Sequence, residues 1–298
     1  MENFLEIKQL SRKEILYIIK KTGKIKNKPE KYFTNLFNNT LLMFFEAPSL
    51  RTRVSFETGM NQLGGKAIYY DISTNPLGRG KETIEDTAKV VSKYCDIVAL
   101  RIYSHSELLK FVQNSTIPVI NMMTNEEHPC QILGDLFTIM EMKKKFNKIT
   151  ISYLGDSNNN VTNSLIYACS ILDIPLKIGC PKLQEFNVRD LVKIFENPEK
   201  AVKDADVVYT DSWMSYRIPK NQEERRVKIL KPYQINENLM RLANEDTIFM
   251  HCLPALRGQE VTREVIDGKQ SVVFEQAENR LHVQKTIMLS LLGRLWIA

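Results

Sequence analysis

Several features that would assign this chain to a specialised class of protein are scarce or missing. Its five cysteines are odd in number and scattered, without the paired spacing of a zinc site or a disulfide framework (Cys95, Cys130, Cys169, Cys180 and Cys252). No apolar run approaches the roughly 20 residues that cross a bilayer, and residues 1–10 lack the apolar core of a secretory signal. We therefore expect reduced thiols, no metal site, no membrane contact and a cytoplasmic location.

Positive charge is present but is not concentrated in one segment. The 298 residues include 41 Lys and Arg against 35 Asp and Glu, a formal charge of +6. The densest basic cluster, residues 143–145, is typical of a solvated helix end. Since nucleic-acid binding needs basic side chains gathered on one face, we expect no nucleic-acid partner. An excess of positive charge still favours anionic substrates such as a phosphate.

Short apolar segments alternate with segments of helical spacing along the chain. The apolar segments predict strands at 41–45, 66–70, 96–100, 118–121, 149–154, 176–179, 207–210 and 248–251. Helices are expected at 53–63, 83–94, 107–113, 129–146 and 279–296. This alternation predicts an α/β protein with two doubly wound parallel-sheet domains and a cleft between them. We expect one domain at 1–145, joined by a returning C-terminal helix at 280–298, and the other at 146–279.

The segment that follows the first predicted strand carries side chains that can bind a phosphate. A helix start offers unpaired N–H groups and the positive end of its dipole. The hydroxyl groups of Ser49 and Thr52 and the guanidinium of Arg51 would add side-chain donors there. Ser49 could equally be an ordinary N-cap and Arg51 a surface charge. The segment alone therefore leaves both interpretations open.

Polar residues also follow the next strands, and the carboxyl ends of parallel strands are where ligands bind. Arg101 follows the strand at 96–100, while His128 and Gln131 open a long helix and share one of its faces. Fixed donors of this kind stabilise charge that develops on a carbonyl oxygen. His128 could instead simply precede a helix that begins at Pro129.

In the second half, residues 157–164 form an asparagine-rich turn after a strand, and Asp211 follows another strand. A dinucleotide site is disfavoured because the glycine fingerprint is absent and Asn side chains stand where a pyrophosphate needs close backbone approach. The carboxylate of Asp211 would attract a ligand with a positively charged end. It would repel a ligand with a second carboxylate, so an amino acid such as L-aspartate is a poor candidate on charge grounds.

In these motifs and their order, the chain resembles the aspartate and ornithine carbamoyltransferase family over nearly its whole length. Residues 49–53, Ser-Leu-Arg-Thr-Arg, are similar to the family's Ser-Thr-Arg-Thr-Arg phosphate motif, with Leu50 in place of the first Thr. Residues 251–255, His-Cys-Leu-Pro-Ala, are highly specific to the family, and residues 275–282 form a further motif. Residues 77–83 resemble a loop that reaches a neighbouring subunit, which implies such a role for Arg79 and Lys81.

The resemblance implies roles for individual residues. The expected carbamoyl phosphate contacts are Ser49, Leu50, Arg51, Thr52, Arg101, His128, Gln131, Cys252, Leu253 and Arg280. Within this set Gln131 and the Leu253 carbonyl would meet the carbamoyl nitrogen. Cys252 would lie beside the attacking amine, without being a covalent nucleophile. The implied catalytic residues are Arg101, His128, Cys252, Asp211 and Arg280, and the implied acceptor-binding residues are Asn163, Asp211, Ser215 and Tyr216.

The activity implied by the resemblance is carbamoyl transfer from carbamoyl phosphate to the side-chain amine of L-ornithine, which gives L-citrulline and phosphate. The family further implies a role in arginine metabolism, no cofactor, and a homotrimer or a multiple of it. Tyr216 and Arg217 depart from the Met-Gly pair typical of ornithine enzymes. This departure affects the residues expected to bind the carboxylate of the acceptor. Putrescine, an amine without a carboxylate, therefore stays open as an alternative acceptor. A non-catalytic ligand-sensing relative is a remoter alternative.

Overall fold

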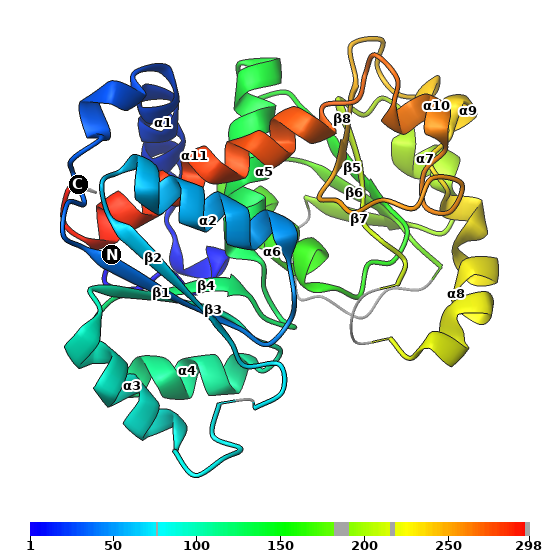
Figure 1. The fold of residues 1–298 in the computed structure, drawn as a ribbon. Helices are drawn as coiled ribbons and strands as arrows, with labels where there is room; N and C mark the ends of the chain where they lie inside the picture. Colours follow the sequence, from blue (N-terminus) through cyan, green and yellow to red (C-terminus); the bar gives the residue numbers. More distant parts are fainter. Residues whose placement is uncertain (76, 182–190, 215–217, 296–298) are drawn as a thin grey trace. The chain divides into compact units, whose positions relative to one another are not determined.

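Two parallel sheets organise the chain, one in each of two units (Figure 1). The computed structural model describes residues 1–75, 77–181, 191–214 and 218–295. Unit 1 consists of Met1–Phe137 and Glu278–Ala298, and unit 2 of Thr138–Ala277. This division falls inside two helices, α5 (Pro129–Lys143) and α11 (Val273–Leu291), whereas we expected it at 145/146 and 279/280. The helical sequence pattern continues across both boundaries, so the sequence gives no sign of where one unit ends and the other begins.

Unit 1 is built on four parallel strands in the order β2-β1-β3-β4. They are β1 (Thr40–Phe45), β2 (Lys66–Asp71), β3 (Ile97–Arg101) and β4 (Val119–Met123). Strands β3 and β4 are buried at every residue, which explains their uninterrupted apolar sequence. Strand β2 lies at the edge and is largely exposed.

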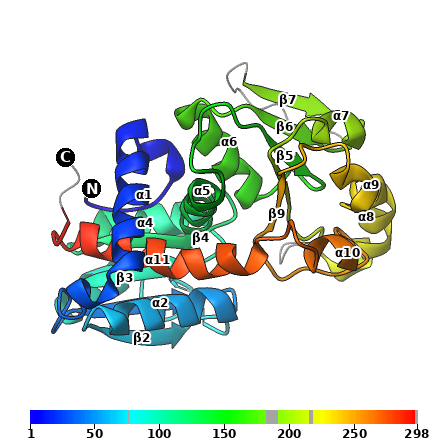
Figure 2. The same ribbon diagram turned by 90° about the horizontal axis from the view of Figure 1, so that it is seen from above.

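Helices cover both faces of this sheet (Figures 1 and 2). Helices α3 (Ile84–Tyr94) and α4 (His105–Asn114) pack on one face, where Phe44, Val98 and Phe111 belong to their shared apolar core. Helix α2 (Leu50–Gln62) lies against α11 on the other face, because Gly59 allows Leu281 and Met288 to approach closely. Helix α1 (Arg12–Asn27) begins with a capping box between Ser11 and Glu14.

Unit 2 is built on five parallel strands in the order β7-β6-β5-β8-β9. They are β5 (Ile151–Leu154), β6 (Leu176–Gly179), β7 (Val192–Phe195), β8 (Val207–Thr210) and β9 (Ile248–His251). The helices are α6 (Asn160–Leu172), α7 (Pro198–Val202), α8 (Glu223–Leu230), α9 (Glu237–Met240) and α10 (Arg263–Ile266). Short 3₁₀ helices occur in the two units at Ile7–Gln9, Pro29–Tyr32, Lys220–Gln222 and Lys231–Tyr233.

The predicted α/β class with two parallel sheets is confirmed, and each predicted strand is present with small shifts at its ends. Strand β7 was not predicted, and its Val-Lys-Ile-Phe sequence is only partly buried. The predicted final helix is present, but α11 begins at Val273, six residues before the predicted start at 279, and ends at Leu291, before the predicted end at 296. Residues 272–274, Val-Val-Phe, have β-branched and aromatic side chains that favour strands, which concealed the helix start.

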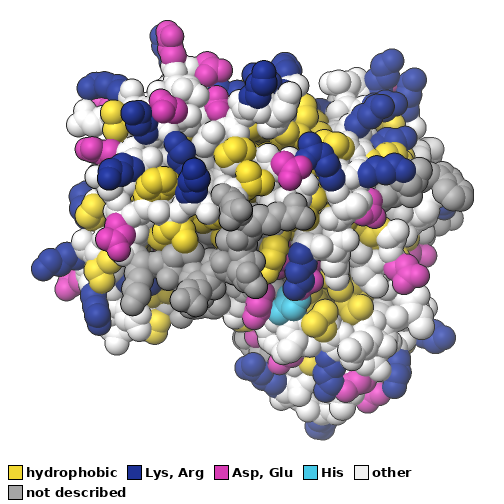
Figure 3. Space-filling view, turned by 180° about the vertical axis from the view of Figure 1, so that it is seen from behind, with side chains coloured by type: hydrophobic (Ala, Val, Ile, Leu, Met, Phe, Trp, Pro, Cys, Tyr) yellow, Lys and Arg dark blue, Asp and Glu magenta, His cyan; other side chains and the backbone are white. Residues whose placement is uncertain are grey.

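The described residues include no helix that is both long and apolar enough to span a membrane. On the face shown in Figure 3, Lys and Arg side chains are dispersed and Asp and Glu lie among them. Charge of one sign is therefore not gathered into a continuous patch on that face.

Candidate active site

Two guanidinium groups of unit 1 meet at the hydroxyl of Thr52, in the first turn of α2. The hydroxyl accepts hydrogen bonds from Arg280 Nη2 at 2.9 Å and from Arg101 Nη1 at 3.5 Å. Thr52 is fully buried, while Arg101 and Arg280 are 5% and 4% exposed. Two like charges so close together in a buried place repel each other. A bound anion would relieve this repulsion, so the arrangement is that of an anion site.

The start of α2 holds this arrangement in place. Ser49 is the N-cap, as its sequence position suggested, and its hydroxyl accepts from the Thr52 backbone N–H at 3.3 Å. Arg101 ends β3, and its Nε donates to the carbonyl oxygen of Ala47 at 3.1 Å. The guanidinium of Arg101 is thus fixed by the loop that leads into α2.

The first turn of α2 also contains the two motif residues between Ser49 and Thr52. Leu50 is 76% exposed, so its side chain faces solvent. Arg51 is half-buried and makes no ion pair with the described residues, which leaves its charge available to a ligand. Arg79 and Lys81 are exposed in the segment between β2 and α3.

His128 adds a neutral donor to the same cluster. It directly precedes α5 and is 7% exposed. Burial lowers the pKa of His128 well below its usual value, and the positive charges of Arg280 and Arg101 lower the pKa further. At neutral pH the imidazole is therefore uncharged and carries one N–H that can donate to a ligand oxygen. Gln131, in the first turn of α5, is 1% exposed.

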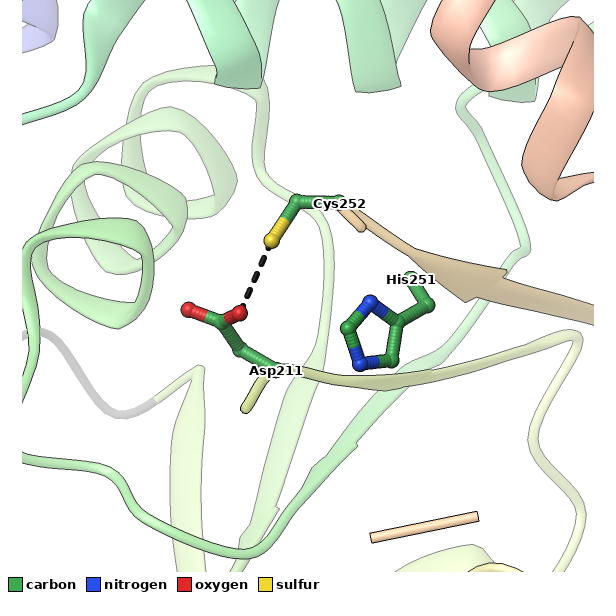
Figure 4. Close-up of side chains that lie close together, drawn as sticks. All are labelled: Asp211, His251 and Cys252. Carbon is green, nitrogen blue, oxygen red and sulfur yellow. Dashed lines mark hydrogen bonds between the residues drawn. The ribbon is translucent and has the colours of Figure 1, made fainter. Parts of the chain in front are cut away.

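A second cluster forms in unit 2 where the neighbouring strands β8 and β9 end (Figure 4). Asp211 follows β8, and Cys252 follows β9. The thiol of Cys252 donates to Asp211 Oδ1 at 2.8 Å, and the backbone N–H of Ser212 donates to the same oxygen at 2.7 Å. Because the thiol acts as a donor to a carboxylate, this geometry does not activate Cys252 as a nucleophile.

His251 holds the backbone that follows Cys252 and is itself held by Glu260. Its Nδ1 accepts from the Leu253 backbone N–H at 2.8 Å, and its Nε2 lies 3.2 Å from Glu260 Oε1. Leu253 has a φ of +57°, in the left-handed region. Asp211, His251 and Cys252 could be considered as metal ligands, since their ligand atoms lie within 4.8 Å of one another. However, both ring nitrogens of His251 are already hydrogen-bonded within the protein, so the set fits a metal ion poorly.

The loops after β5 and β8 are tied together by Arg226 of α8. Its guanidinium pairs with Asp156, which follows β5, and its Nε donates to the Trp213 carbonyl oxygen at 3.1 Å. Burial raises the pKa of Asp156, and the charge of Arg226 opposes that rise. Asn163 lies in the first turn of α6 and is half-buried.

The structure thus brings together Thr52, Arg101, His128 and Arg280 in unit 1, and Asp211, Cys252 and Leu253 in unit 2. Ser215 and Tyr216, two of the expected acceptor-binding residues, lie outside the described residues. Sequence reasoning missed Glu260, which contacts His251 nine positions earlier, and Arg226, which pairs with Asp156 at a sequence separation of 70. It also missed Asp135, which hydrogen-bonds Gln131. Their spacing of four residues within one helix was a signal that could have revealed this contact.

Comparison with known proteins agrees with a two-domain organisation of the chain. Residues 2–141 match the family described as aspartate/ornithine carbamoyltransferase, carbamoyl-P binding domain, and residues 147–291 match its Asp/Orn binding domain. The chain is 46% identical to the ornithine carbamoyltransferase of Caldicellulosiruptor saccharolyticus over 311 aligned residues, which cover 99% of this chain and all of that protein. It is 43% identical to the ornithine carbamoyltransferase of Archaeoglobus fulgidus, with 99% and 98% covered.

Solved structures give the same result. The ornithine carbamoyltransferase of Pyrococcus furiosus matches with a TM-score of 0.92 and 39% identity over 99% of this chain and 98% of that one. The enzyme from Burkholderia thailandensis matches with a TM-score of 0.90 and 40% identity over 99% and 100%. The two parallel-sheet units and these matches define a two-domain α/β protein. The chain belongs to the aspartate/ornithine carbamoyltransferase family.

Proposed function

We propose that this protein transfers the carbamoyl group of carbamoyl phosphate to the side-chain amine of L-ornithine and releases L-citrulline and phosphate. The observation that carries the proposal is the meeting of two buried guanidinium groups at Thr52, with the neutral imidazole of His128 under the influence of both charges. Relatives that match nearly the whole chain are named ornithine carbamoyltransferase, which supports the same reaction and the choice of acceptor.

In this proposal the phosphate is bound at the start of α2 by Ser49, Arg51, Thr52 and the residue 50 backbone, with Arg280 beside them. Arg101, His128 and Thr52 donate to the carbonyl oxygen, where negative charge grows as the amine attacks. Donors that are already oriented stabilise this charge without reorganising. Because His128 is neutral, it adds a hydrogen bond without a third positive charge that would compete for the same anion.

The acceptor is assigned to the cluster of unit 2. The carboxylate of Asp211 attracts the ammonium end of ornithine, and Asn163, Ser215 and Tyr216 are proposed as further acceptor-binding residues. The contacts of Cys252 and Leu253 with the reacting groups, implied by the family resemblance, are part of the proposal. The hydrogen bond from Cys252 keeps the Asp211 carboxylate oriented, which supports a positioning role for the thiol.

The attacking amine must be neutral, which sets the expected pH dependence. A side-chain amine with a pKa near 10.4 is mostly protonated at pH 7, and removing that proton costs roughly 4 to 5 kcal/mol. Turnover at saturating substrate should therefore rise from pH 6 toward about 8 to 9 as the bound amine loses its proton. Initial rates of citrulline formation measure this profile. A flat profile between pH 6 and 9 would contradict amine attack as the limiting step.

A homotrimer in the cytoplasm is also part of the proposal. The edge strand β2 and helix α3 expose apolar side chains along a groove of about 630 Å³, which another copy of the chain would cover (Tyr70, Val90 and Tyr94). Sedimentation equilibrium would give the mass of the assembly directly. A monomer mass at micromolar concentration would contradict this part.

The main test is a colorimetric assay for the carbamoylated product with carbamoyl phosphate and each of two amines in parallel. L-Ornithine should be carbamoylated with a kcat/KM at least a hundredfold above that of putrescine, which lacks the carboxylate. Faster carbamoylation of putrescine would move the assignment to the alternative acceptor. Absence of product with either amine would contradict the catalytic proposal and favour a ligand-sensing relative.

A further inference from the structure

Two buried side chains of α5 are joined by a hydrogen bond whose direction is fixed by chemistry. Gln131 and Asp135 are each 1% exposed and lie one helical turn apart in unit 1. Gln131 Nε2 donates to Asp135 Oδ1 at 2.8 Å. A carboxylate can only accept hydrogen bonds, whereas an amide has one end that donates and one that accepts. Asp135 therefore binds the NH₂ end of the Gln131 amide, so the carbonyl oxygen of Gln131 points away from Asp135.

That carbonyl oxygen is a buried acceptor in need of a donor. Gln131 Oε1 has no hydrogen-bond partner among the described residues. Leaving a buried acceptor unpaired is unfavourable, and native proteins rarely do so without a reason. Gln131 belongs to the same helical turn as His128, whose imidazole is influenced by Arg101 and Arg280 of the anion site. A ligand bound there with an N–H group would supply the missing donor.

We propose that Asp135 is a positioning residue that makes the site select an acyl phosphate bearing an NH₂ group over one bearing a methyl group. The proposal rests on the proposed function, since carbamoyl phosphate is the ligand of the first kind. Acetyl phosphate has the same phosphate and carbonyl groups but a methyl group in place of NH₂. When Gln131 Oε1 is held toward the ligand, the NH₂ group of carbamoyl phosphate donates to this oxygen. The methyl group of acetyl phosphate cannot donate and leaves the oxygen unpaired. Sites with such buried polar groups reject analogues that lack the matching group.

The test compares the binding of both acyl phosphates to the intact protein by titration calorimetry, which does not depend on turnover. The ratio of the acetyl phosphate Kd to the carbamoyl phosphate Kd should exceed about a hundred in the wild type. Asp135→Asn has the same shape, but its amide can donate as well as accept, so Gln131 can turn its NH₂ end outward. The ratio should fall at least tenfold in Asp135→Asn, chiefly through weaker binding of carbamoyl phosphate.

Inorganic phosphate serves as the control probe, because it needs the cationic donors but not the amide. Its Kd should stay within about twofold of the wild type in Asp135→Asn. A general collapse of the site would weaken phosphate and both acyl phosphates together, and this outcome would overturn the proposal. An unchanged ratio in Asp135→Asn would overturn it as well.

The matched variant Gln131→Met removes the acceptor and leaves Asp135 in place. It should lower the ratio by a similar factor, and adding Asp135→Asn to it should change the ratio no further. An additional loss in the double variant would show that Asp135 acts by another route. Gln131→Met also keeps the inference testable if Asp135→Asn does not fold, because a wild-type ratio in Gln131→Met would refute it. Citrulline formation by the wild type is measured separately, so failure of the transfer reaction is distinguished from failure of this inference.

Discussion

The clusters of unit 1 and unit 2 are built in different ways. The unit 1 cluster takes Thr52, Arg101, His128 and Arg280 from α2, β3, the start of α5 and α11, and it is rich in positive charge. The unit 2 cluster takes Asp211 and Cys252 from the ends of two adjacent strands, and its central group is a carboxylate. The phosphate site proposed in unit 1 needs several donors around one ligand, and these come from segments far apart in the chain.

The difference between the clusters is tested most strongly by removing one guanidinium from unit 1. Arg101→Met should lower kcat/KM for carbamoyl phosphate about a thousandfold, because an oriented donor to the growing oxyanion is lost. Steady-state kinetics with ornithine saturating measure the change. Arg257→Met is a matched control, since Arg257 is exposed and pairs with Asp267 away from the phosphate motif. Similar losses in both variants would contradict a special role for Arg101.

A change in unit 2 should affect the other substrate. Asp211→Asn removes the charge that attracts the ammonium group but keeps the shape, so kcat/KM for ornithine should fall about a hundredfold. The Kd of carbamoyl phosphate measured without ornithine should change by less than about threefold. If carbamoyl phosphate binding weakens as much as ornithine use, the separation of roles between the clusters is wrong.

The lowered pKa of His128 predicts how stability depends on pH. Its folded-state pKa lies below the unfolded value near 6.5, so the unfolded chain binds the proton more readily. This contribution to stability is fully present above about pH 6.5 and is lost as the pH falls toward the folded-state pKa. Between pH 6.5 and 5 the wild type should lose up to about 2 kcal/mol more unfolding free energy than His128→Gln. Urea unfolding at both pH values measures the difference, and parallel losses would contradict a neutral buried His128.

The smallest expected effect concerns the exposed position in the phosphate motif. Leu50→Thr restores the hydroxyl that the family motif has there, and one added hydrogen bond should lower KM for carbamoyl phosphate about two- to tenfold. Leu50→Ala is the control, because it also removes the exposed leucine but adds no donor. An equal gain in both variants would show that the hydroxyl is not the cause.

Much of the fold followed from local sequence patterns, whereas parts of the site did not. Buried parallel strands such as β3 are continuous apolar runs, and such runs predict strands directly. Strand β7 is half-buried at the sheet edge and gave no such run. Glu260 contacts His251, and Arg226 contacts Asp156, but neither residue has a distinctive neighbourhood in the sequence. Arg226 and Asp156 lie 70 positions apart, and Glu260 lies nine positions after His251 outside any shared helix or strand, so packing and not local pattern brings each pair together.

By itself, the sequence determined the two parallel sheets, the order of the motifs and the chemical types of the site residues, because periodicity and side-chain chemistry are local properties. Only the tertiary structure decided that Arg280 reaches Thr52 across 228 positions of sequence separation, and that His128 is neutral. It also decided which end of the Gln131 amide faces Asp135. These properties depend on burial and on neighbouring charges, and both arise only when segments far apart in the chain pack together.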